Sequence, residues 1–140
     1  MKIHQLSVFV SNQPGHLRAP CQILAEAGIN LETLSLADTQ QYGILRLIIR
    51  DWQRAKDVLE AADFVVKVTD VLAVKIPDRP GGLVDVLKII DEAGINIEYM
   101  YAFSTHRDDM AVLIVRFENV DDAIEALEHS EIDMISSVDL

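Results

Sequence analysis

Hydrophobic residues recur at every second position near the start of the chain. Leu6, Val8 and Val10 alternate with Ser7 and Ser11, a spacing typical of a β-strand with one buried face. Similar patterns bounded by polar or glycine-containing turns predict the other strands. These lie at about residues 29–37, 45–49, 64–69, 71–76, 95–104, 110–117 and 132–138.

Helical spacing separates these strands. Leu17, Cys21 and Leu24 recur on one side of a helix. Pro14 suits the first turn of that helix because its φ angle is fixed, and Gly28 is suited to end it in the left-handed conformation. Further helices are predicted at about residues 52–62, 81–93 and 120–129.

The second half of the chain repeats the first at a shift of 66 positions. Pro14-Gly15 aligns with Pro80-Gly81, and the five-residue run 26–30 reappears unchanged at 92–96. Two motifs in one register indicate a duplication. Each copy has the order β-α-β-β-α-β, which predicts the α+β class, with two ferredoxin-like units in tandem, antiparallel sheets and helices on one face. We expect the units to comprise residues 1–69 and 70–140, with almost no linker.

Composition and charge exclude several classes of partner. The 140 residues carry a net charge of −11, and the twelve Lys and Arg are scattered, so neither nucleic acid nor an anionic membrane is expected to bind. No apolar run approaches the roughly 18 residues of a membrane helix, and the start does not resemble a signal peptide. We therefore expect a cytoplasmic protein. Cys21 is the single cysteine and is interpreted as a packed small side chain.

No pattern indicates catalysis, a cofactor or a metal. The four histidines stand in unlike contexts without metal-ligand spacing, and there is no phosphate-binding glycine motif. Asp108-Asp109 is interpreted as a hairpin turn and Asp121-Asp122 as a helix start. We therefore expect a protein that is not an enzyme.

The duplicated loop before the first helix of each copy is the candidate binding site. Unpaired amides at a helix start suit a carboxylate, and glycines allow a ligand to approach the backbone. Asn12 and Asp78 add an oxygen acceptor for an ammonium group, so the pair of features fits a free α-amino acid. The alternative is that Asn12 and Asp78 only cap their helices. Asn30 and Asn96 begin the second strand of each copy, and either could reach a ligand held by another copy.

The pattern (Asp/Asn)-x-Pro-Gly-x-Leu, helix, Ala-Gly-Ile-Asn, strand resembles the ACT domain, and its double occurrence resembles a tandem ACT-domain protein. The resemblance covers nearly the whole chain. It implies a regulatory module that binds amino acids at interfaces between paired domains. The implied ligand-binding residues are Asn12, Gln13, Pro14, Gly15, His16, Leu17, Ile29, Asn30, Asp78, Arg79, Pro80, Gly81, Gly82, Leu83, Ile95 and Asn96.

Two departures from the family pattern predict unequal sites. Asn12 replaces the commoner acidic residue, and His16 stands where the second copy has Gly82. Tyr99, Tyr101 and Phe103 are interpreted as a stripe that packs in the core.

We expect a homodimer, because both faces of the strand at 110–117 are apolar. A regulated metabolic enzyme would be a separate chain. Two alternatives stay open. One is an interaction subunit that docks on an enzyme without a ligand, and the other is an acylphosphatase-like hydrolase that uses Arg79.

Overall fold

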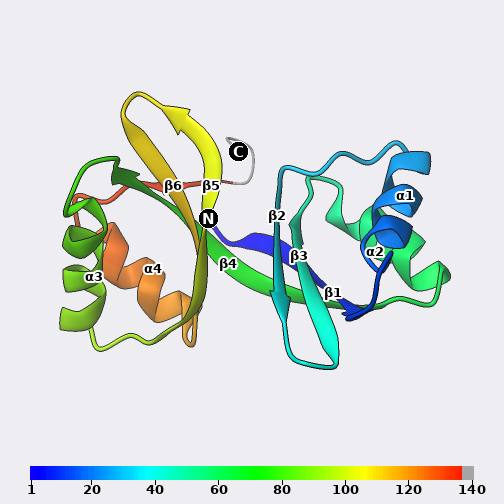
Figure 1. The fold of residues 1–140 in the computed structure, drawn as a ribbon. Helices are drawn as coiled ribbons and strands as arrows, with labels where there is room; N and C mark the ends of the chain where they lie inside the picture. The colour runs from blue at the N-terminus through cyan, green and yellow to red at the C-terminus, as the bar shows by residue number, and fades with distance from the viewer. Residues whose placement is uncertain (137–140) are drawn as a thin grey trace. The chain divides into compact units, whose positions relative to one another are not determined.

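The computed structural model describes residues 1–136, apart from the side chains of residues 104–107, and the chain forms two compact units. The first unit is His4–Thr69, and the second comprises Met1–Ile3 with the chain from Asp70 onward. In each unit, two helices lie on one side of the unit's own sheet (Figure 1). The predicted α+β class with two ferredoxin-like units is therefore confirmed.

The first unit contains six elements in the predicted order. They are β1 (Ile3–Ser11), α1 (Arg18–Glu26), β2 (Thr33–Asp38), β3 (Tyr42–Ile48), α2 (Trp52–Ala61) and the first part of β4 (Val65–Pro77). The strand order is β2-β3-β1-β4, and β3 pairs antiparallel with both β1 and β2. Leu6 of β1 lies opposite Leu47 of β3 and Val8 opposite Leu45, so these side chains share the core-facing side with Leu59 of α2.

The second unit repeats this plan. It contains the rest of β4, then α3 (Gly82–Glu92), β5 (Ile97–Arg107), β6 (Met110–Phe117), α4 (Val120–Glu128) and β7 (Met134–Ile135). The strand order is β5-β6-β4-β7. Its core contains Leu72, Val74, Val86, Phe117 and Leu127, all at most 5% exposed.

The glycines that follow α1 and α3 explain how the chain reverses direction after each of these helices. Gly28 and Gly94 both have φ +69°. The amide of Ile29 donates to Leu24 O at 2.9 Å, and that of Ile95 donates to Ile90 O at 3.2 Å. Bonds of this kind, which close the last helical turn around a left-handed glycine, form the Schellman motif. The predicted left-handed helix ends are therefore confirmed.

Several predicted boundaries are wrong. β2 begins at Thr33 rather than Ile29, and β5 at Ile97 rather than Ile95, because Ile29 and Ile95 are bonded back to their helices. α1 begins at Arg18, so Pro14 lies in a turn before the helix. The last strand covers Met134–Ile135 within the described chain, and residues 137–138 of the prediction lie outside it.

Both faces of the first strand, β1, are buried. Gln5 is 0% and Ser7 6% exposed, although both alternate with the core residues Leu6 and Val8. β1 is an interior strand with β3 on one side and β4 on the other, but sheet neighbours cover the edges of a strand rather than its faces. The burial of Gln5 and Ser7 shows that the second face of β1 is covered as well. Alternation in the sequence predicts which side chains share a face, but it does not predict that the second face is exposed.

Candidate functional site

The two Pro-Gly loops have the same backbone over their first five residues. In the first unit the amide of Gln13 donates to Ser11 O at 3.0 Å and that of His16 to Gln13 O at 3.2 Å. The second unit repeats both bonds, since Arg79 N donates to Pro77 O and Gly82 N to Arg79 O, each at 3.0 Å. Gly15 and Gly81 have φ +83° and +84°. The duplication is therefore visible in the loop geometry itself.

The loops diverge one residue later. In the second unit Asp85 N donates to Gly81 O at 3.1 Å, which is an α-helical bond, and α3 begins at Gly82. In the first unit Arg18 N donates to Gly15 O at 3.2 Å, which is a bond of the 3₁₀ type, and α1 begins only at Arg18.

A steric reason for this difference lies at position 16 and its repeat, position 82. A Cβ atom on Gly82 would lie 2.1 Å from Pro77 O, a separation that real side chains do not tolerate. His16 carries such a Cβ atom, so the first loop cannot close as tightly and its helix starts later. The two loops are therefore unequal in shape, with the closer approach of backbone to backbone in the second unit.

Neither Asn12 nor Asp78 is the N-cap residue of its helix. The N-cap of α1 is Leu17 and that of α3 is Gly81, and neither makes a side-chain capping bond. Asn12 instead reaches the β2–β3 hairpin. Its backbone amide donates to Gln41 O at 3.3 Å, and its Nδ2 donates weakly to Gln40 O at 3.4 Å. Asp78 N donates to Asp109 O of the β5–β6 hairpin at 2.9 Å.

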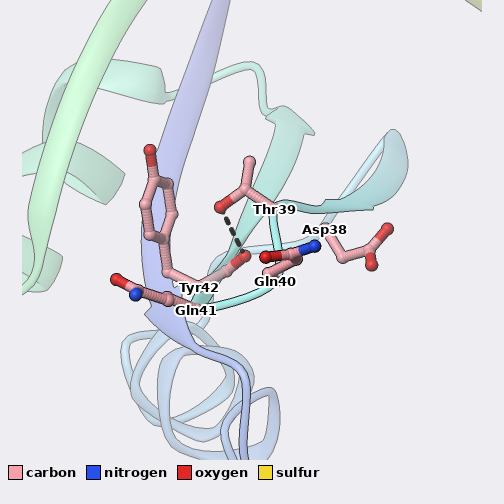
Figure 2. A pocket seen from close by; sticks show the side chains of 5 residues that line it. All are labelled: Asp38, Thr39, Gln40, Gln41 and Tyr42. Atoms are coloured by element: carbon pink, nitrogen blue, oxygen red, sulfur yellow. Dashed lines mark hydrogen bonds between the residues drawn. The ribbon is translucent and has the colours of Figure 1, made fainter.

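The β2–β3 hairpin adds an open hollow beside the first loop. It is lined by Asp38, Thr39, Gln40, Gln41 and Tyr42. Figure 2 shows the side chains of Asp38 and Gln41 projecting outward on opposite sides of the turn, while Thr39 Oγ1 donates to Tyr42 O at 3.2 Å across it. The sequence predicts this stretch as a polar turn, but not its contact with Asn12. The only signal in the sequence is the density of polar residues.

Charged and polar side chains in the two loops have different partners. Arg79 Nη2 donates to Asp85 Oδ2 at 2.6 Å and Arg79 Nη1 to Pro80 O at 3.1 Å. The repeat places Gln13 and Ala19 at the corresponding positions of the first unit, so that unit has no such ion pair. His16 Nδ1 forms a hydrogen bond with the carbonyl oxygen of Gln13. In both units a side chain thus folds back on its own loop.

Asn30 and Asn96 do not meet the Pro-Gly loop of their own unit. Each follows the Schellman turn at the far end of α1 or α3, and a nine-residue helix such as α1 spans about 14 Å. Both side chains are exposed, and Asn96 O accepts a bond from Glu118 N at 3.0 Å. A site that combines an asparagine with a loop therefore needs a second unit.

The prediction that Tyr99, Tyr101 and Phe103 pack in the core is wrong. Tyr101 lies opposite Ile114 and Phe103 opposite Val112, whereas the core residues of β6 are Leu113, Val115 and Phe117. The aromatic stripe is therefore on the sheet face that does not carry the helices, and its side chains are half-buried.

Other chemistry in the described chain lies away from these loops. Residues 1–136, as far as their side chains are described, contain no group of three or more potential metal ligands. Hydrogen bonds to Asp121 and Glu60 raise the pKa of Lys2 and Lys56, respectively. Within the described residues, no helix combines the length and the apolar character that crossing a membrane requires.

The fold and the paired glycine loops define a tandem protein of two ferredoxin-like units. The protein-family model that describes the ACT domain pair matches residues 1–140, and the chain belongs to this family. The resemblance to ACT domains is therefore confirmed. A comparison with curated proteins found no match.

Solved structures agree with this assignment. Protein BT0572 from Bacteroides thetaiotaomicron is 35% identical, with a TM-score of 0.92 over 99% of this chain and 95% of that protein. The regulatory subunit of aspartate kinase from Thermus thermophilus is 18% identical, with a TM-score of 0.64 and coverage of 91% and 92%. Aspartate kinase from Clostridium acetobutylicum is 14% identical, with a TM-score of 0.57 over 90% of this chain and 32% of that enzyme. The last two share the fold.

Proposed function

We propose that this chain is a non-catalytic regulatory protein that binds a free amino acid at an interface between ACT units, of one chain or of two. The observation that carries the proposal is the loop geometry common to both copies. Gly15 and Gly81 both hold the left-handed conformation, with φ +83° and +84°. A backbone conformation that most residues avoid occurs at the same position of both loops, which favours a ligand that approaches the backbone there.

The chemistry of the loops fits a zwitterion. An ammonium group would be accepted by the side chain of Asn12 or Asp78, and a carboxylate would face the glycine-bearing turn at the start of the helix. We assign the ligand contacts to residues 12–17 and 78–83 of these loops, with Ile29-Asn30 and Ile95-Asn96 contributed by a neighbouring unit. Asp78 carries the charge that Asn12 lacks, so the second loop is the stronger candidate.

The same proposal makes the regulated metabolic enzyme a separate chain and places the protein in the cytoplasm. The ion pair of Arg79 with Asp85 at 2.6 Å counts against an acylphosphatase-like role, because that role needs the guanidinium for an anionic substrate. The resemblance to ACT domains supports the same proposal, because it implies a regulatory module that binds amino acids.

Melting temperature tests the proposal directly. A ligand that binds only the folded chain stabilises it by RT ln(1 + [L]/Kd), about 2.7 kcal/mol at a hundredfold excess over Kd. Each of the twenty amino acids is added at millimolar concentration, and at least one should raise the melting temperature. Asp78→Ala should remove that rise in a chain that still folds, while Asn12→Ala should remove less of it. No rise with any amino acid would contradict the proposal.

A further inference from the structure

One ion pair lies across the Pro-Gly loop of the second unit. Arg79 Nη2 lies 2.6 Å from Asp85 Oδ2, in the first turn of α3, and Arg79 Nη1 donates to Pro80 O at 3.1 Å. A Cβ atom placed on Gly81 would lie 3.6 Å from Arg79 Nη1. The guanidinium is therefore held beside the left-handed turn at which we expect an amino acid to approach the backbone.

The backbones of the two charged residues are fixed, but their side chains can move. The amide of Arg79 donates to Pro77 O and its carbonyl oxygen accepts from Gly82 N, each at 3.0 Å. The amide of Asp85 donates to Gly81 O at 3.1 Å. The two side chains are 54% and 53% exposed, so the pair can open by side-chain rotation alone. An exposed pair of this kind changes an equilibrium by a factor of about five or less, which a competing carboxylate can overcome.

Arg79 has one carboxylate neighbour in space and another along the chain. Asp85 is its ion-pair partner, and the exposed residue before it is Asp78. Two negative charges near the guanidinium disfavour a doubly charged anion such as phosphate. A free amino acid presents one group of each sign, so its ammonium can bind Asp78 while its carboxylate binds the guanidinium. The three charged residues therefore favour a zwitterion over an anion.

The first loop replaces all three charged residues with uncharged ones. The repeat places Asn12, Gln13 and Ala19 at these positions. Both loops nevertheless have the same backbone bonds over their first five residues, so the charges are not needed to form that backbone. A role in binding accounts for their presence in one loop only.

We propose that Asp85 is an internal substitute for the carboxylate of the ligand. It holds the Arg79 guanidinium in the unliganded chain, and the carboxylate of an incoming amino acid takes its place. This inference rests on the proposed function and adds a competing group to it. Because one ion pair of Arg79 is exchanged for another, Asp85 lowers the affinity for the amino acid. Occupation of the second loop also separates Asp85 from Arg79, so the charge at the start of α3 changes its surroundings with the bound state.

Calorimetric titration of variants tests the exchange. The probe is the amino acid that raises the melting temperature most in the screen of all twenty. Asp85→Ala should bind it about two- to fivefold more tightly than the native chain, and Arg79→Gln should bind it more weakly. Adding Asp85→Ala to Arg79→Gln should give no gain, because no guanidinium is then released. Asp91→Ala removes the same charge from α3 six residues further on, and this matched control should bind like the native chain.

Salt dependence separates an exchange of partners from a simple change of charge. In the native chain, Arg79 has one ion pair before binding and one after it. In Asp85→Ala a new pair forms on binding, so its affinity should fall more steeply than the native affinity as NaCl rises from about 50 mM to about 500 mM. Equal salt dependence of the two chains would overturn the exchange.

The outcomes separate this inference from the proposed function. If an amino acid binds the native chain and Asp85→Ala binds it no more tightly, only the exchange is wrong. If no amino acid binds either chain, both proposals are wrong. Binding to Asp85→Ala alone would support the exchange. Inorganic phosphate at the same concentration should not raise the melting temperature, and a rise that Arg79→Gln removes would show an anion site and overturn the preference for a zwitterion.

Discussion

Gly82→Ala tests the steric explanation for the unequal loops. The added Cβ atom would lie 2.1 Å from Pro77 O and 3.2 Å from Pro77 C, where ordinary contacts begin at 3.4 Å. The carbonyl oxygen belongs to the backbone, so it cannot move by a change of rotamer, and a backbone shift of about 1 Å is needed to restore contact distance. Overpacking of this kind costs about 1–3 kcal/mol. The higher helix propensity of alanine offsets less than about 1 kcal/mol of that cost.

The expected result is a fall in the stability of the second unit. For a domain of this size, 1 kcal/mol corresponds to about 4–8 °C in melting temperature. A net cost of about 1–2 kcal/mol, after the helix-propensity offset, should therefore lower the melting temperature by roughly 4–16 °C in calorimetry. Hydrogen exchange should show faster exchange in peptides that cover α3. Trp52, the single tryptophan, lies in the first unit and provides a fluorescence signal for that unit.

The matched control is His16→Ala, because position 16 already carries a Cβ atom and its loop is adapted to it. We expect its stability to change by no more than about 0.5 kcal/mol, as for most surface substitutions. The reasoning is refuted if Gly82→Ala melts like the native chain. It is also refuted if His16→Ala costs as much as Gly82→Ala.

Two further predictions concern each unit's own contacts. Leu59→Ala removes a fully buried side chain from the core of the first unit and should lower the free energy of unfolding by about 2–5 kcal/mol. The melting temperature followed by Trp52 fluorescence should therefore fall. Leu127→Ala, the counterpart in the second core, should leave that transition in place, and equal shifts would show that the units unfold together. The pKa of Lys2 is raised above 10.5 by its hydrogen bond to Asp121, so the contribution of Lys2 to stability is present below pH 10.5 and is lost as the pH rises through the raised value. Lys2→Met should flatten the fall of melting temperature above pH 10.5, and an unchanged slope would contradict this.

The elements that the sequence predicts correctly are those fixed by local chemistry. Gly28 and Gly94 end their helices as expected, and Asp108-Asp109 forms the hairpin turn with φ +54° and +57°. The start of α4 is also correct, with Asp121 and Asp122 in its first turn. Each of these features depends on residues within one turn of the chain, so the sequence contains the information needed.

The features that were predicted wrongly depend on contacts between distant segments. The spacing of Tyr99, Tyr101 and Phe103 indicates a strand face, but the register with β6 decides that this face is not the core. The contact of Asn12 with Gln40 and Gln41 crosses 28 residues or more of sequence. Neither fact follows from local pattern, because period-2 alternation does not say which face meets the helices.

The duplication allows each substitution to be compared with its counterpart in the same chain. Where the first loop has Asn12, Gln13 and His16, the second has Asp78, Arg79 and Gly82. An acidic side chain can hold an ammonium more strongly than an amide can, because a charged partner strengthens the hydrogen bond.

A position without a Cβ atom also permits the tighter turn of the second loop. Within one duplicated chain, the features suited to an amino acid are therefore concentrated in the second unit. Asp78→Ala should therefore abolish the ligand-induced rise in melting temperature, whereas Asn12→Ala should leave part of it.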